Sequence, residues 1–296
     1  MRVGYSLFAV FLVAANALGQ DGARPVGMVL MPLGDVTVTR GSARQPAQLA
    51  DLLFAGDQIV TGANSSVMFS FCPANEKLSI AAGSAITLEA ATARQTRGAA
   101  ATRAAGARCA LPQVALGKRD IEHIGTMAAR GAPPIAIYIG GVVSSGRPLF
   151  TWRPVPNATD YTVTVRNTAN RVLWNWQQAG EAREVRMPAT ENELPPGVYN
   201  WEVTARAATR IVGQQRAAFT VKPDAQLASM QPQDLASRIE YAVELENAGY
   251  LAEAAGVYRQ LRTEVPGDSR FGSQLIWLYW NAGLIMASNE EIAAAK

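Results

Sequence analysis

Hydrophobic and polar residues alternate along much of the first third of the chain. In the stretch Asp-Val-Thr-Val-Thr-Arg, Val36 and Val38 fall on one face of an extended strand, and residues 66–71 repeat the period of two. Turn signals such as Ala-Gly-Asp and Thr-Gly-Ala-Asn-Ser separate these runs at intervals of about 8 to 12 residues. The pattern predicts an antiparallel, all-β unit over residues 25–90.

A second alternating region covers residues 136–223. Its apolar positions fall on one face of three expected strands, which carry Phe150 and Trp152, then Tyr161, Val163 and Val165, then Tyr199, Trp201 and Val203. This arrangement predicts a β-sandwich with an aromatic core. Trp174 and Trp176 also share one face of a strand, with polar Asn175 and Gln177 between and beside them. That face is either core or an exposed stacking strip for a ligand, because a half-buried strand has the same pattern in both cases.

Beyond the second β region the apolar residues recur at spacings of three and four, which is the helical period. One stripe comprises Leu235, Ile239, Ala242 and Val243, and a second comprises Leu251, Ala254, Ala255, Tyr258 and Leu261. Pro266 and Gly267 end the second stripe. Residues 228–296 are therefore expected to form a helical unit, so the chain is predicted to be multidomain, mainly β with a C-terminal α-helical unit.

The last expected helix, residues 271–288, carries no charged residue. It is too polar and too short for a membrane span, and a helix that is apolar all round must be buried. It is expected either to cap the preceding helices or to dock on another domain or chain. Its aromatic residues Trp277, Tyr279 and Trp280 are the candidate partner-binding residues, together with Trp174 and Trp176.

Charge is nearly balanced, with 27 basic and 24 acidic residues and a net charge of +3. This excess is too small to indicate nucleic-acid binding. Within residues 91–135, expected to be a linker or extension rich in Ala and Arg, the basic residues Arg94, Arg97, Arg103 and Arg108 have no acidic neighbours up to Arg119. The stretch is interpreted either as a solvated, flexible insertion or as a contact with an anionic surface such as a cell-wall polymer.

The N-terminus has the order of a secretory signal peptide. Arg2 precedes an apolar run over residues 7–15, and small residues follow, so residues 1–19 are expected to be removed on export to the periplasm or medium. An exported chain meets an oxidising compartment, where its two cysteines, Cys72 and Cys109, are expected to form a disulfide. The alternative is a pair of buried free thiols.

Candidate catalytic chemistry is sparse. The single histidine, His123, lies beside Glu122 without a nucleophile motif, a phosphate-binding loop or a dinucleotide fingerprint elsewhere. Two cysteines and one histidine cannot complete a tetrahedral zinc site. We therefore expect a protein without enzymatic activity, metal or cofactor.

The first β region resembles the FecR-type domain, whose pattern joins a Gly-x-Val strand to Leu-x-x-Gly-Asp-x-Val-x-Thr-Gly and then to Leu-x-Leu. The matching residues are Gly34, Val36, Leu53, Gly56, Asp57, Ile59, Thr61, Leu78, Ile80 and Ile86. Gly56 and Asp57 suit a tight turn, which explains them without a catalytic role. The resemblance implies periplasmic sensing. Direct relay to a sigma factor is not expected, since only about five residues precede the apolar run.

Two further resemblances concern the rest of the chain. The second β region resembles fibronectin type III and related immunoglobulin-like sandwiches, although it lacks the cysteine pair of antibody domains. The helical region resembles the tetratricopeptide repeat, a 34-residue helix-turn-helix unit, and Gly249 and Gly283 lie 34 residues apart. The family pattern is matched at Gly249, Ala254, Tyr258, Leu261 and Pro266, but Arg238 replaces the usual tryptophan and Ala242 a common glycine. A second unit, with Leu275, Tyr279 and Gly283 in register, is expected to stop after its first helix.

These modules mostly bind other molecules. The sequence therefore predicts an exported, non-catalytic binding or scaffold protein of a bacterial cell envelope, with an envelope protein as partner. The alternatives are a FecR-like periplasmic sensing component and a protein that binds cell-wall polymer or polysaccharide.

Overall fold

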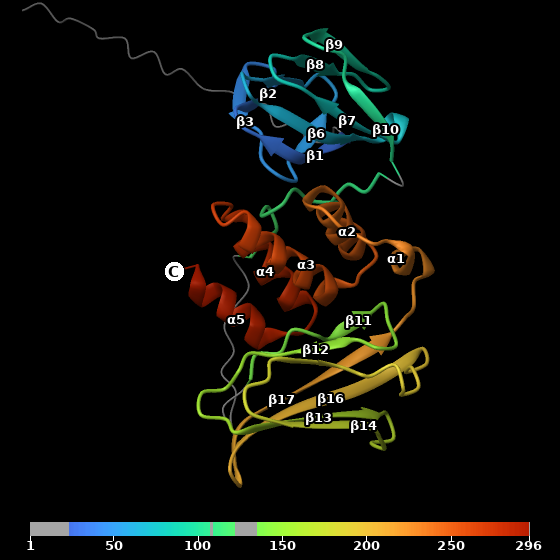
Figure 1. Cartoon of the computed structure of the whole chain (residues 1–296), viewed down its shortest axis with the longest axis vertical. Helices are drawn as coiled ribbons and strands as arrows, with labels where there is room; N and C mark the ends of the chain where they lie inside the picture. The colour runs from blue at the N-terminus through green and yellow to red at the C-terminus, as the bar shows by residue number, and fades with distance from the viewer. Residues whose placement is uncertain (1–23, 107–108, 122–134, 296) are drawn as a thin grey trace, which may run out of the picture.

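The helical unit lies between the two β units, although it follows both of them in the sequence. The computed structural model describes residues 24–106, 109–121 and 135–295. In Figure 1 the N-terminal strands form one layer, the helices a middle layer, and the strands that follow residue 140 a third layer. The expected signal peptide at residues 1–19 falls outside the described residues.

The N-terminal unit consists of two five-stranded sheets around one core. One sheet has the order β10 (Thr102–Ala105), β7 (Glu76–Ile80), β6 (Ser66–Phe71), β1 (Pro25–Leu33) and β4 (Leu52–Phe54). The other has the order β3 (Ala43–Pro46), β2 (Val36–Arg40), β5 (Gln58–Thr61), β8 (Ala85–Leu88) and β9 (Ala93–Arg97). Strands β9 and β10 lie within residues 91–135, so that segment extends both sheets before it continues toward the helices.

Strand β1 is buried on both of its faces. Val29 belongs to the core of the N-terminal unit, whereas Met28 and Leu30 belong to a larger core that includes the helices. Helix α2 packs against β1. Because successive side chains of a strand point to opposite faces, a strand covered on both sides needs a continuous apolar run, and residues 26–31 provide it.

The second β unit has a main sheet with the order β11 (Gly141–Val143), β17 (Arg210–Val221), β16 (Gly197–Ala207), β13 (Asp160–Asn167) and β14 (Val172–Ala179). A second layer pairs β12 (Leu149–Thr151) with β15 (Glu184–Arg186). Phe150 of β12 contacts Trp201 of β16 across the two layers, with ring centroids 4.9 Å apart. The predicted sandwich with an aromatic core is therefore present.

The helical unit contains two hairpins after a short helix, α1 (Ala225–Ser229). The first hairpin comprises α2 (Leu235–Asn247) and α3 (Leu251–Glu264), and the second comprises α4 (Arg270–Asn281) and α5 (Ile285–Ala294). The expectation that the second unit stops after its first helix was wrong. Gly283 has a φ of 75°, which turns the chain at the end of α4 and lets α5 pack back on it.

The two hairpin turns repeat each other bond for bond at a separation of 34 residues. The amide of Tyr250 donates to the carbonyl of Leu245, and the amide of Leu284 donates to that of Tyr279, each over 2.8 Å. Gly249, with a φ of 87°, has the same role in the first turn as Gly283 in the second. The 34-residue spacing of the two glycines in the sequence thus corresponds to two copies of one local structure.

Candidate functional site

The aromatic face of α4 rests on other parts of the same chain. Tyr279 is fully buried, and its ring lies 5.8 Å from that of Tyr138, which leads into the sandwich. Trp277 is half-buried beneath the guanidinium of Arg119, whose central carbon lies 4.1 Å from the ring centroid. Trp280 is also half-buried. Tyr279 and Trp277 therefore make intramolecular contacts, and that of Tyr279 with Tyr138 fits the expectation that this helix docks on another domain.

The junction between the helices and the sandwich carries several polar contacts. The hydroxyl of Tyr138 donates to Glu290 of α5 over 2.7 Å, and Arg153 donates to the other carboxylate oxygen over 2.7 Å. Arg259 of α3 lies over the Tyr138 ring at 4.1 Å. Burial, aided by the hydrogen bond to Glu290, raises the pKa of Tyr138 above its ordinary value. These contacts attach both helical hairpins to the sandwich.

A cleft of about 390 Å³ lies along this junction, between α3 and the β12–β15 layer. Glu253 lines it, and one of its carboxylate oxygens accepts a hydrogen bond from the amide of Ser144 over 3.0 Å. The other oxygen is enclosed and has no hydrogen-bond partner within the described part of the chain. Burial raises the pKa of Glu253, although Ser144 and nearby Arg186 oppose the shift.

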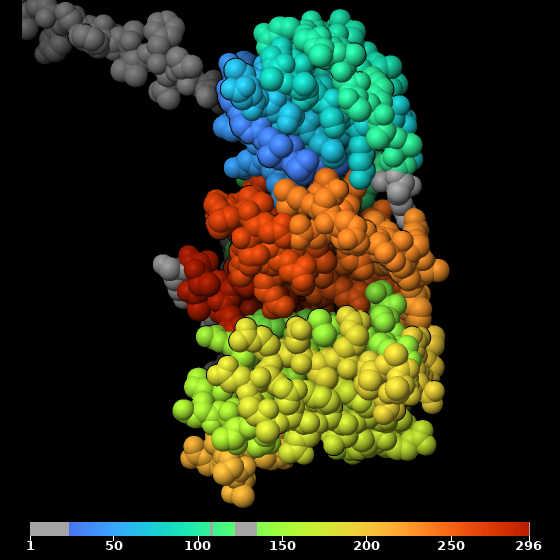
Figure 2. Space-filling view, viewed as in Figure 1, coloured from blue at the N-terminus to red at the C-terminus, as the bar shows by residue number. Residues whose placement is uncertain are grey.

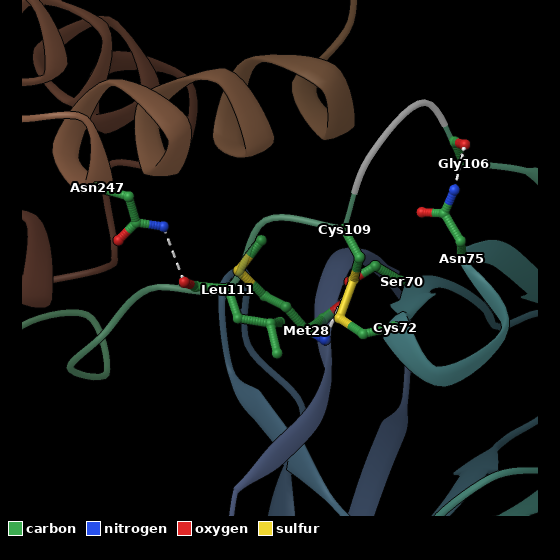
Figure 3. Close-up of a disulfide and its surroundings, with 8 residues drawn as sticks. All are labelled: Met28, Ser70, Cys72, Asn75, Gly106, Cys109, Leu111 and Asn247. Atoms are coloured by element: carbon green, nitrogen blue, oxygen red, sulfur yellow. Dashed lines mark hydrogen bonds between the residues drawn. A yellow bond between two sulfur atoms is a disulfide. The ribbon is translucent and has the colours of Figure 1, made fainter.

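The junction with the N-terminal unit is made by ion pairs and by an extended segment. Lys77 of β7 pairs with Glu240 of α2 over 2.6 Å, and Arg270 of α4 pairs with Asp51 over 2.6 Å. The extended segment comprises Ala110–Ile121, which contains no helix or strand; we call it the strap. Figure 3 shows where it begins, at the Cys72–Cys109 disulfide, and the bond of 3.0 Å from the side chain of Asn247 to the carbonyl of Leu111.

The strap ends on a buried carboxylate, Glu246 of α2, which is 6% exposed. Arg119 forms an ion pair with one oxygen of Glu246. The other oxygen accepts hydrogen bonds from the side chain of Gln274 over 2.7 Å and from the hydroxyl of Tyr258 over 3.2 Å. Burial, followed by the charge of Glu246, raises the pKa of Tyr258 well above its ordinary value. Glu246 therefore binds the guanidinium of Arg119, a residue of the strap, which forms neither helix nor strand.

The disulfide between Cys72 and Cys109 was correctly predicted. It joins residues 37 apart in the sequence, and it fixes the start of the strap to the N-terminal unit. Disulfides of this kind persist in oxidising compartments.

Three of the four basic residues proposed to contact an anionic surface lie on the exterior of the N-terminal unit. Arg94 pairs with Glu89, Arg103 pairs with Glu76, and Arg97 donates to the carbonyl of Gly83. The fourth, Arg108, falls outside the described residues. These arginines therefore already have partners on their own sheets.

The tryptophans proposed as a stacking strip point into the sandwich. Trp174 is 7% exposed and stacks on Phe150, with centroids 5.9 Å apart. Trp176 is half-buried, and its ring meets Trp152 edge-on at 6.1 Å. The pattern of their strand fits both interpretations, and the structure corrects the strip to core because β12 covers that face.

Acidic side chains are scattered over the part of the chain that the structure describes. That part contains no group of three His, Cys, Asp or Glu side chains able to hold a metal ion. His123 lies outside the described residues. Among the helices of the described ranges, none is long and apolar enough to cross a membrane. Two of the candidate sites on the described residues are the cleft beside Glu253 and the face of α2 and α4 under the strap.

Similarity to known proteins is found among solved structures alone. No protein-family model matches the chain, and no curated protein matches it. Among solved structures, the chain aligns with chitinase ChiW from a Paenibacillus species at 11% identity and a TM-score of 0.25, over 35% of its own length and 10% of that chain. A segment of two fibronectin type III domains from chicken tenascin aligns at 9% identity and a TM-score of 0.25, over 67% and 95%. The chicken interferon gamma receptor alpha chain aligns at 13% identity and a TM-score of 0.22, over 66% and 86%.

Proposed function

We propose that this chain is an exported, non-catalytic scaffold protein of a bacterial cell envelope. In this proposal a FecR-like β module and a fibronectin type III-like sandwich present binding surfaces to envelope proteins. A tetratricopeptide-like helical unit holds the two modules at a fixed spacing. The observation that carries the proposal is the position of the helices between the two modules, with specific contacts on both sides.

The contacts on each side are of a kind that resists sliding. Toward the N-terminal module, Arg270 donates both to the Asp51 carboxylate and to the carbonyl of Leu49, each over 2.6 Å. Toward the sandwich, the hydroxyl of Tyr250 donates to the carbonyl of Lys222 over 2.9 Å at the end of β17. One continuous apolar core also joins the sandwich, the helices and the outer face of β1. Figure 2 shows the three layers stacked in contact along the length of the molecule.

Small-angle X-ray scattering of the chain in solution tests the fixed spacing. The wild-type profile is expected to match one rigid three-layer body. A double substitution at the N-terminal junction, Lys77→Ala with Arg270→Ala, is expected to increase the radius of gyration. The matched control, Arg94→Ala, removes an exposed ion pair of the N-terminal unit that takes no part in the junction contacts, and should leave the radius of gyration unchanged.

Cross-linking in envelope extracts tests the binding role. A scaffold should capture the same partner with the wild-type chain and with the control variant, and less of it with the junction variant. A wild-type scattering profile that only independently moving modules can fit would contradict the fixed spacing, and equal capture by all three chains would show that the spacing is irrelevant to binding.

A further inference from the structure

Strand β14 is the long, uncharged edge among the sheets of the described residues. It spans eight residues, Val172–Ala179, and pairs with β13 alone. The other edge strands, β3, β4, β9, β10, β11, β12 and β15, are three to five residues long. Proteins protect sheet edges by shortness, charge, proline or bulges, because open backbone groups can pair with another chain. β14 contains no charge and no proline, and its one bulge, at Leu173, leaves residues 174–179 regular.

Half of the backbone groups of β14 face away from its neighbour β13. The amide of Gly180 donates to the carbonyl of Thr159 over 2.7 Å at the end of this strand pair. Bonded and non-bonded pairs alternate along antiparallel strands, so the backbone groups of Asn175 and Gln177 face outward. The hydroxyl of Thr164, opposite Asn175, donates to its side chain over 2.9 Å, which fits a non-bonded pair with close side chains. Asn175 and Gln177 therefore have backbone groups available for another strand.

The open edge lies on the side of the sandwich away from the helices. β14 is one edge of the main sheet, and β11, at the opposite edge, packs against α3. In Figure 1 the strands β17, β16 and β13 lie between the helical layer and β14. A second chain can therefore pair with β14 without displacing the contacts that join the sandwich to the helices.

Two identical edges can pair antiparallel about a twofold axis, in which the same surface patch of each copy forms the interface. The outward-facing backbone groups of one copy must then meet those of the other. This condition requires the axis to pass through a residue and not between two residues. An axis at Trp176 meets it, because Asn175 of each copy then stands opposite Gln177 of the other.

The charges at the two ends of β14 distinguish this register from its neighbours. With the axis at Trp176, Arg171 just before the strand stands opposite Glu181 of the second copy, just after its strand. Both side chains are exposed. An axis one residue earlier places Arg171 opposite Ala179, and an axis one residue later places it opposite Arg183, a like charge. The register at Trp176 is the one of these three that pairs opposite charges at both ends.

The side chains near the axis are also complementary to themselves in this register. Asn175 and Gln177 are exposed, and their amide groups can donate to and accept from each other across the axis. Trp176 is half-buried against Trp152 of its own chain. The rings of Trp176 in the two copies meet at the axis, where the exposed part of each is covered by the other.

We propose that β14 pairs antiparallel with β14 of a second copy of this chain, about a twofold axis at Trp176. The two main sheets then form one continuous sheet. The occupant is a second copy because the edge is complementary to itself in charge and in amide groups. A strand pair of this length buries less surface than a permanent dimer, so the dissociation constant is expected in the micromolar range. The inference goes beyond the proposed scaffold and does not depend on the fixed spacing of its modules.

Sedimentation velocity of the full chain from about 1 to about 200 μM measures the equilibrium between monomer and dimer. Arg171→Glu and Glu181→Arg each place like charges opposite one another and should weaken the dimer about tenfold. The two changes in one chain restore opposite charges and should return the dissociation constant to within about twofold of the wild type. Arg97→Glu is the matched control, since it makes the same charge change on the N-terminal unit, and should dimerise as the wild type does.

A backbone variant tests the strand pairing itself. Gln177→Pro removes an outward-facing amide that β13 does not use, and an edge strand accommodates proline at such a position. It should abolish the dimer, and circular dichroism melting establishes that each variant folds. If Gln177→Pro does not fold, the charge reversals at exposed residues decide the question.

Several results would overturn the proposal. A wild type that stays monomeric over the whole range excludes the dimer. Single charge reversals that dimerise as the wild type does, or a double reversal that does not recover, exclude this register. A dimer retained by folded Gln177→Pro places the interface elsewhere. A monomeric wild type whose Asn175 and Gln177 amides exchange more slowly when a peptide of residues 171–181 is added would assign the edge to an extended segment of another protein. Scattering below the dimer midpoint reports the single chain, so this proposal and the fixed spacing fail separately.

Discussion

Arg270 of α4 reaches across the junction and donates to the carboxylate of Asp51 over 2.6 Å, although 219 residues separate the two in the sequence. Both side chains are largely enclosed, with 20% and 17% exposure. The same guanidinium also bonds to Asp268 over 2.7 Å. One residue therefore ties the start of the second hairpin to the N-terminal unit.

Replacing Arg270 by alanine should lower the free energy of unfolding by about 1 to 3 kcal/mol, because a partly buried carboxylate loses its charged hydrogen bonds. The matched control is Arg216→Ala, whose 70% exposed side chain pairs with Glu202 on the sandwich and should change stability by about 0.5 kcal/mol or less. Equilibrium denaturation with urea measures both. Equal effects of the two substitutions would show that the Arg270–Asp51 pair contributes no more to the free energy of unfolding than an exposed ion pair does.

Two buried tyrosines should respond differently to the loss of their hydroxyl. The hydroxyl of Tyr279 is buried without a partner among the described residues, whereas that of Tyr258 donates to Glu246. Tyr279→Phe should therefore leave stability unchanged or raise it, and Tyr258→Phe should lower it by about 1 to 2 kcal/mol. The thermal midpoint of each variant decides the matter, and a greater loss for Tyr279→Phe would show that its hydroxyl has a partner.

Two glycines of the helical unit should have opposite effects when changed to alanine. Gly249 has a φ of 87°, which alanine adopts at a cost, so Gly249→Ala should destabilise the chain by about 1 kcal/mol. Gly256 lies inside α3 with nothing within 4 Å of a Cβ built on it. Gly256→Ala should stabilise the chain by about 0.5 to 1 kcal/mol. Denaturant unfolding of the two single variants provides the measurement, and effects of the same sign would contradict the argument.

The sequence predicted the elements whose signal is periodic and local. The alternation of apolar and polar residues located most strands of both β units. The resemblance to a 34-residue repeat located the first helical hairpin. The same 34-residue spacing could have located α5. Leu284 and Ser288 stand 34 residues after Tyr250 and Ala254, which lie at the start of α3. The expected stop after the first helix left residues 285–294 without an element, although they form α5.

The placement of the helices could not be predicted from periodicity. Arg119 and Glu246 are 127 residues apart, and no local pattern indicates which acid an arginine in an Ala-rich segment will meet. One signal was available, since the continuous apolar run from Val26 to Met31 is typical of a strand that is covered on both faces. This signal indicates that another element packs on the outer face of β1, but it does not identify that element. The pattern of its own strand does not show whether Trp174 is core or surface. That depends on the opposite layer, where Phe150 of β12 stacks on it.

Stability should depend on pH through Glu253 in a direction set by its surroundings. Burial raises the pKa of this carboxyl, so the folded chain holds its proton to a higher pH than the unfolded chain does. The stability that Glu253 contributes is therefore full below its ordinary pKa of about 4.3 and is lost as the pH rises through the folded value. Asp234, at the start of α2, behaves oppositely: hydrogen bonds from Ser237 lower its pKa, so its contribution is present at neutral pH and is lost on acidification.

Glu253→Gln retains an acceptor for the Ser144 amide and removes the charge. It should raise the thermal midpoint at pH 7 and match the wild type at about pH 3, where the carboxyl is protonated in both states. Asp234→Asn should lower the midpoint at pH 7, with a difference that narrows as the pH falls. Scanning calorimetry of the three chains over this range measures both trends. A lower midpoint for Glu253→Gln at pH 7 would show that the ionised carboxylate is satisfied in the fold, because a cation or donor would then have to lie beside its enclosed oxygen.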